Sequence, residues 1–121
     1  MRAKETEKEA VLDSLSDVVI HQDLEHRVLW TNRQAVVSAG ISAEQFQDSY
    51  CHEVWANSSN PCVGCPLEAA KKTGQPQNGE IVTPDGRVWF ITGCPIKDAK
   101  GNLTSFVEVA REITAQKKAR R

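Results

Sequence analysis

Four cysteines are the residues of this chain whose type and spacing suit chemistry: Cys51, Cys62, Cys65 and Cys94. Cys62 and Cys65 form a C-x-x-C pair between two prolines, and two thiolates at this spacing can chelate one metal ion or form a redox-active disulfide. A tetrahedral zinc site or an iron–sulfur cluster needs four ligands. Cys51 is the candidate for the third ligand, and Cys94 or His52 for the fourth.

The chemistry of these cysteines stays open between three alternatives. Cys65 precedes Pro66 at the expected start of a helix, where unpaired amides and the positive end of the helix dipole favour a thiolate. Cys94 belongs to a predicted strand, and the sequence does not decide which face of the sheet it occupies. Buried cysteines are also common small apolar residues. Metal binding, redox chemistry and simple packing therefore remain alternatives.

Composition and charge argue against several classes of protein. The 121 residues, with 40% apolar and 26% charged side chains, are typical of one globular domain. The formal net charge is −1 and the basic residues are dispersed except at the C-terminus, which argues against nucleic-acid binding. No apolar run approaches the roughly 18–20 residues of a membrane span, and the N-terminus does not resemble a signal peptide, so we expect a cytoplasmic location. Without a catalytic triad order or a phosphate loop, we expect no enzymatic activity.

The elements that must position the cysteines follow from local pattern. Gly40 and Gly74 are typical helix stops, Ser42 to Gln45 fits a capping box, and Pro66 suits a first helical position. The predicted order is a helix over 1–16, strands over 17–21 and 28–31, helices after Asn32 and Ser42, an irregular segment over 50–66, a helix over 66–73, and strands over 80–83, 87–96 and 103–111. This order predicts an α+β fold: an antiparallel five-stranded sheet with short helices on one face and flanking N- and C-terminal helices.

The order of these elements and several short motifs resemble the PAS family over roughly residues 9–116. The matching motifs are Trp30-Thr31-Asn32, the step Gly40-Ile41-Ser42, the turn Asp85-Gly86, and the closing Glu112-Ile113-Thr114, where the family usually has Asp-Ile-Thr. The segment from Cys51 to Pro66 resembles a cysteine-bearing subgroup of that family.

The PAS resemblance implies a pocket between the inner face of the sheet and the short helices. Candidates to line this pocket are Trp30, Trp55, Leu67, Trp89 and Ile91, and their alternative role is core packing. Haem-binding relatives place a histidine in the helix over 66–73, and flavin photoreceptor relatives carry an Asn-Cys-Arg motif. The chain has neither feature, so haem and flavin are disfavoured, while zinc or iron–sulfur at the cysteines stays open.

The resemblance also implies a sensory role as the input domain of a bacterial-type signalling protein. Such a domain binds a small ligand or senses metal or redox state, and relays the change to an effector such as a histidine kinase. The predicted divisions are a helical lead-in over 1–16, a sensor domain over 17–111, and the start of a signalling helix over 112–121, with the two flanking segments as homodimer contacts. Two alternatives are a cysteine-based metal or redox protein and a pure dimerisation module.

Overall fold

The structure, a computed structural model, describes residues 17–47, 49–56 and 65–119. The helix predicted over 1–16 and the first cysteine of the C-x-x-C pair, Cys62, lie outside these residues. Among the residues described, no helix is both long enough and apolar enough to cross a membrane.

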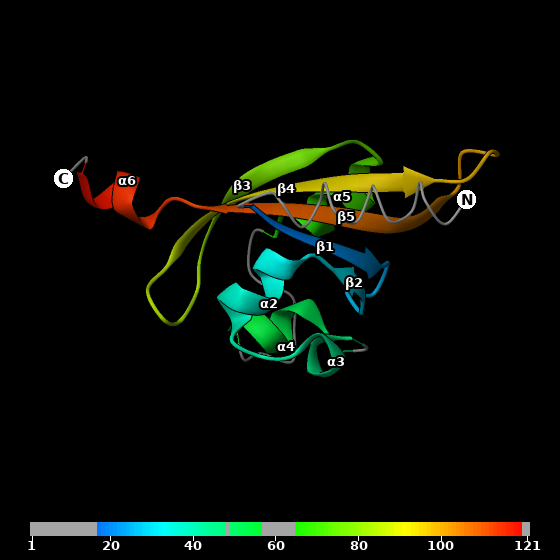
Figure 1. The fold of residues 1–121 in the computed structure, drawn as a ribbon. Coiled ribbons are helices and arrows are strands. Elements are labelled where there is room, and N and C mark those ends of the chain that lie inside the picture. The colour runs from blue at the N-terminus through cyan, green and yellow to red at the C-terminus, as the bar shows by residue number, and fades with distance from the viewer. Residues whose placement is uncertain (1–16, 48, 57–64, 120–121) are drawn as a thin grey trace, which may run out of the picture.

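As predicted, five antiparallel strands form one sheet, and the structure places them in the order β2-β1-β5-β4-β3 (Figure 1). The strands are β1 (Val18–Asp23), β2 (Val28–Thr31), β3 (Gln77–Val82), β4 (Val88–Lys97) and β5 (Leu103–Glu112). Because β1 pairs with β5 along its whole length, the first and last strands of the chain lie side by side in the centre of the sheet. The predicted bounds of β4 and β5 are within one residue of these, whereas β3 begins three residues earlier than predicted.

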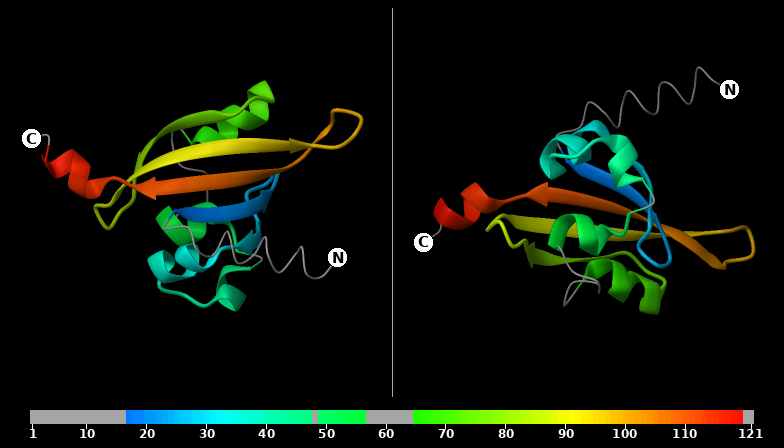
Figure 2. Two further views of the ribbon diagram at one scale, coloured as in Figure 1. Left: turned by 45° about the horizontal axis from the view of Figure 1, so that its top comes forward. Right: turned by 90° about the horizontal axis from the view of Figure 1, so that it is seen from below.

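Helices α2 (Arg33–Ala39), α3 (Ala43–Phe46), α4 (Cys51–Ala56) and α5 (Pro66–Thr73) gather on one face of the sheet (Figure 2), and α6 (Thr114–Ala119) continues beyond β5. Local signals account for most of the helix ends. Asn32 Oδ1 accepts the amide of Ala35 at the start of α2, and the predicted capping box opens α3 with both of its hydrogen bonds. Gly40 follows α2 with a φ of 74°, a left-handed conformation that suits glycine.

The prediction of an irregular segment over 50–66 is wrong for its first part, because Cys51–Ala56 is helix α4. The sequence of α4 has no strong N-cap residue, which is why local pattern missed it. Tertiary contacts stabilise it instead: the amide of Cys51 donates to the carbonyl of His26 in the β1–β2 turn, at 2.9 Å. Val54 and Trp55 then pack against the main core cluster.

The core lies between the sheet and the helices in two clusters. The larger one joins β1, β2, α2, α3, β4 and β5 through the buried residues Val18, Ile20, Val28, Ala35, Phe46, Trp89 and Ala110. The smaller one joins α5 to β5 through Leu67, Ala70 and Phe106. The space between the two clusters is the part of the inner face that the candidate site occupies.

Strand parity determines which side chains reach that space. A Cβ atom on Gly93 would lie 3.0 Å from Leu67 Cδ2, so Gly93 faces helix α5. Since side chains alternate along a strand, Trp89 and Ile91 share this inner face, and Cys94 points to the opposite side of the sheet.

Candidate functional site

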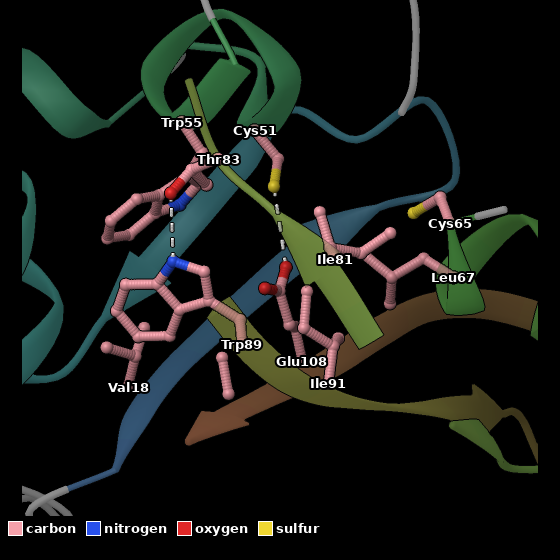
Figure 3. Close-up of a pocket in the computed structure, with 11 residues that line it drawn as sticks. Val18, Cys51, Trp55, Cys65, Leu67, Ile81, Thr83, Trp89, Ile91 and Glu108 are labelled. Carbon is pink, nitrogen blue, oxygen red and sulfur yellow. Dashed lines mark hydrogen bonds between the residues drawn. The ribbon is translucent and has the colours of Figure 1, made fainter. Parts of the chain in front are cut away.

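A cavity of about 40 Å³ lies between the inner face of the sheet and helices α4 and α5 (Figure 3). On this measure a water-sized group takes roughly 10–15 Å³, so the cavity has room for about three to four such groups. Its wall is almost entirely apolar. The lining residues are Val18, Cys51, Trp55, Cys65, Leu67, Ile81, Thr83, Trp89, Ile91, Glu108 and Ala110.

Two indole rings form one end of the cavity wall. Trp55 on α4 and Trp89 on β4 meet edge to face, with ring centroids 5.4 Å apart. Trp89 Nε1 donates to Thr83 Oγ1 at 3.2 Å, and this hydroxyl donates in turn to Asp85 at 2.6 Å (Figure 3 draws the first bond). The Arg87 guanidinium lies 5.0 Å from the Trp89 ring centroid and 5.9 Å from that of Trp55. These contacts hold the aromatic wall in one orientation.

Among the described residues that line the cavity, Glu108 is the one with an acidic side chain. It belongs to β5 and is 3% exposed. Its Oε1 accepts two hydrogen bonds, from Gln22 Nε2 at 2.7 Å and from Cys51 Sγ at 3.4 Å (Figure 3 draws the second). Burial raises the pKa of Glu108 above 4.5, and the hydrogen bonds from Cys51 and Gln22 offset that rise in part. The cavity therefore combines an apolar wall with a single buried carboxyl group.

The structure brings two of the four cysteines together at this cavity. Cys51 on α4 and Cys65 at the start of α5 both line it (Figure 3). Cys94 lies on the opposite side of the sheet, paired with Val107, so it does not join them in a four-cysteine site. Cys62 lies outside the described residues. Within the described part of the chain, no three His, Cys, Asp or Glu side chains gather as metal ligands.

His52, the alternative fourth ligand, lies on α4 rather than in a loop. It is 8% exposed, stacks on Tyr50 with ring centroids 5.5 Å apart, and meets His26 edge to face. His52 is not among the residues that line the cavity. Its contacts are those of a core-packing residue on the helix flank.

Four of the five predicted pocket residues line the cavity: Trp55, Leu67, Trp89 and Ile91. Trp30 does not. Trp30 pairs with His21 on β1, and paired residues point to the same side of the sheet. Since the neighbouring Ile20 points inward and side chains alternate along a strand, His21 and Trp30 point to the other side of the sheet.

Sequence reasoning missed Glu108 and Thr83 as cavity residues. Alternation in Phe106-Val107-Glu108-Val109-Ala110 places Glu108 in phase with Phe106 and Ala110, which is the available signal for a buried acid. The signal is ambiguous because the intervening valines are equally apolar.

Comparison with known proteins agrees with this architecture. A family profile described as the PAS fold matches residues 12–118. A PAS domain from Colwellia psychrerythraea superposes with a TM-score of 0.73 at 18% identity, covering 93% of this chain and 98% of that one. A comparison with curated protein sequences finds no match.

Two further structures come from signalling proteins. The PAS domain of nitrogen regulation protein NR(II) from Vibrio parahaemolyticus has a TM-score of 0.68 at 17% identity, covering 88% of this chain and 97% of that one. A sensory box sensor histidine kinase from Vibrio cholerae has a TM-score of 0.68 at 12% identity, covering 94% of each chain. At these identities the structures establish a common fold. With the family profile spanning nearly the whole sequence and the strand order observed here, the chain belongs to the PAS family.

Proposed function

We propose that this chain is a signal-input domain in which occupancy of the cavity by a small ligand is relayed to helix α6. The observation that carries the proposal is how close the cavity wall lies to the start of α6. Trp89 lines the cavity, and its neighbour Val88 holds the strand-to-helix junction through two hydrogen bonds. The Val88 amide donates to Thr114 Oγ1 at 2.9 Å, and the Val88 carbonyl accepts the amide of Ile113 at 2.8 Å.

A second contact supports this route. Lys117 on α6 lies 2.9 Å from the carboxylate of Glu80 on β3, so the helix is attached to the two strands at one end of the sheet. A ligand that displaces the Trp89 ring shifts the backbone of β4, and the first residues of α6 must follow. Coupling through adjacent packed elements of this kind needs no long path.

We propose that the recipient of the signal is an effector domain such as a histidine kinase, and the similarity to PAS domains of sensor proteins supports this proposal. We propose a sensor domain over 17–111, with 1–16 and 112–121 as the segments that contact a second copy of the chain. The domain itself carries no proposed enzymatic activity.

Xenon tests the relay, because it enters apolar cavities without forming hydrogen bonds. We expect xenon pressure to shift the NMR signals of the cavity walls and the amides of residues 113–118. In the variant Thr114→Val, which removes the acceptor for the Val88 amide but keeps the side-chain shape, the wall signals still shift and the α6 shifts shrink. Xenon shifts that stop at the cavity wall in the wild-type chain would contradict the relay.

Metal or redox sensing by the cysteines is the second candidate. It is favoured by Cys51 and Cys65 lining one cavity and by the C-x-x-C spacing of Cys62 to Cys65. The test is anaerobic purification followed by elemental analysis for zinc and iron and a thiol count. Stoichiometric metal with masked thiols, lost in Cys62→Ser, supports metal sensing, whereas four titratable thiols without metal reject it, and four thiols that stay titratable after mild oxidation reject redox sensing as well.

A further inference from the structure

Glu108 presents one carboxyl oxygen to the cavity. Both hydrogen bonds to this carboxyl end on Oε1, from Gln22 and from Cys51. Oε2 accepts no hydrogen bond from any other residue that the structure describes, and it belongs to a side chain that lines the cavity (Figure 3). A buried polar atom aimed into an apolar cavity costs free energy unless something in the cavity engages it.

The surroundings of Glu108 favour its neutral form. The side chain is buried, and none of the ion pairs among the described residues includes it. Its two hydrogen-bond partners are uncharged, the Gln22 amide from β1 and the Cys51 thiol from α4, and its cross-strand partner on β4 is Gly93. An unpaired carboxylate in such a setting takes up a proton rather than remain charged.

The two accepted hydrogen bonds locate that proton. In a carboxylic acid one oxygen is the carbonyl acceptor and the other carries the hydrogen. Since Oε1 accepts from both Gln22 and Cys51, the hydrogen belongs to Oε2 and points toward the cavity. The cavity thus offers a hydrogen-bond donor.

We propose that the cavity binds a small uncharged molecule with a hydrogen-bond acceptor, a carbonyl oxygen or ring nitrogen, to which Glu108 Oε2 donates. This inference rests on the proposed function, because it names the class of ligand for the same cavity. The volume of about 40 Å³ limits the ligand in this conformation to about four non-hydrogen atoms. Cations and anions are excluded because the apolar wall would strip their hydration without supplying an opposite charge.

Three probes of about four non-hydrogen atoms separate the alternatives. Acetone carries the acceptor, 2-methylpropene has the same shape with no acceptor, and isopropylammonium carries a charge and donors. The readout is titration of the full chain followed through the indole N–H signals of Trp55 and Trp89. We expect acetone to bind about tenfold more tightly than 2-methylpropene, the usual effect of one hydrogen bond, and isopropylammonium not to bind.

Two substitutions test the role of the acid. In Glu108→Gln the amide keeps a carbonyl acceptor for Gln22 and Cys51 and turns an N–H donor into the cavity, so acetone affinity stays within about threefold. Glu108→Met fills similar space without a donor, so acetone affinity falls about tenfold while 2-methylpropene affinity is unchanged. The infrared band of a protonated carboxyl, present in the wild-type chain near neutral pH and absent in Glu108→Gln, reports the protonation state even if Glu108→Met does not fold.

The outcomes distinguish this inference from the proposed function. Equal binding of acetone and 2-methylpropene to the wild-type chain and both variants overturns the role of Glu108 and leaves the ligand cavity intact. Preferential binding of isopropylammonium, or a missing infrared band, shows an ionised carboxylate and also overturns it. If neither these probes nor xenon binds, the ligand-sensing function fails together with the inference.

Discussion

Gly93 is a point of close approach between helix α5 and the sheet. A Cβ atom added there would lie 3.0 Å from Leu67 Cδ2, 3.2 Å from Leu67 Cα and 3.2 Å from the carbonyl oxygen of Pro66. The first contact can relax because the end of a leucine side chain moves. The other two involve the backbone of α5, so the helix must move away from β4 by a few tenths of an ångström. Gly93→Ala therefore overpacks the interface between α5 and the sheet.

The magnitude follows from two opposing effects. Overpacking of a core typically costs about 1–3 kcal/mol, and replacing a strand glycine with alanine returns about 0.4–1 kcal/mol by restricting the unfolded chain. We expect a net loss of about 1.5 kcal/mol in the free energy of unfolding for Gly93→Ala. With a urea dependence of about 1.5 kcal/mol per molar, the urea midpoint falls by about 1 M.

Gly79→Ala is the matched control. Gly79 lies on the neighbouring strand β3 and faces the same helix, but its added Cβ atom would meet Pro66 Cγ at 3.5 Å, an ordinary van der Waals distance. We expect Gly79→Ala to leave the urea midpoint unchanged or to raise it slightly. Urea unfolding followed by tryptophan fluorescence measures both variants. Equal midpoints for the two variants would refute the claim that α5 is seated against Gly93.

Three further substitutions test other parts of the structure. Phe46→Ala removes a fully buried ring that meets Trp55 at 5.9 Å between centroids, and urea unfolding should show a loss of about 3–5 kcal/mol. Asn32→Ala removes a buried helix cap whose Oδ1 also accepts a β1 amide, so the same assay should show a loss of about 2–3 kcal/mol. The hydrogen bond from His26 lowers the pKa of Glu68 in the folded protein below its usual 4.5. The contribution of this hydrogen bond to the free energy of unfolding is therefore fully present above pH 4.5, and it is lost as the pH falls through the lowered pKa of Glu68. The stability difference between wild type and Glu68→Gln should be well under about 1 kcal/mol, because the carboxylate is 38% exposed, and should vanish in acid.

Each of these predictions has its own contrary result. A loss below about 1 kcal/mol in Phe46→Ala would mean that the ring is not part of a packed core. Asn32→Asp keeps the acceptor oxygen, so it should retain the helix start, seen by NMR, that Asn32→Ala loses. A difference between Glu68→Gln and wild type that persists unchanged down to about pH 3 would exclude the contact with His26 as its source.

Local pattern was enough to predict most of the fold. Capping at Ser42, the stops at Gly40 and Gly74, and proline at the start of α5 act over a few residues, and each is confirmed in the structure. The five strands follow from β-branched runs between turn residues, whereas their order within the sheet comes from the structure. Helix α4 was missed because contacts with residues distant in sequence, not its own residue preferences, stabilise it.

The candidate site was predictable only in part. Sequence patterns identified four cavity residues, Trp55, Leu67, Trp89 and Ile91, because large apolar residues in this fold face the helices. The prediction for Trp30 was wrong because a strand has two faces and residue type does not show which face a side chain occupies.

The sequence by itself determined every described element except α4, the order of these elements along the chain and the family, because they depend on interactions between near neighbours and on the order of short motifs. The tertiary structure decided which side chains meet. Strand register turned Cys94 away from Cys51 and Cys65, and brought Glu108 under Cys51 from a position 57 residues further along the chain. Register acts on every side chain of a strand at once, since a shift of one residue exchanges the two faces. The chemistry of this cavity is therefore a property of how the strands pair.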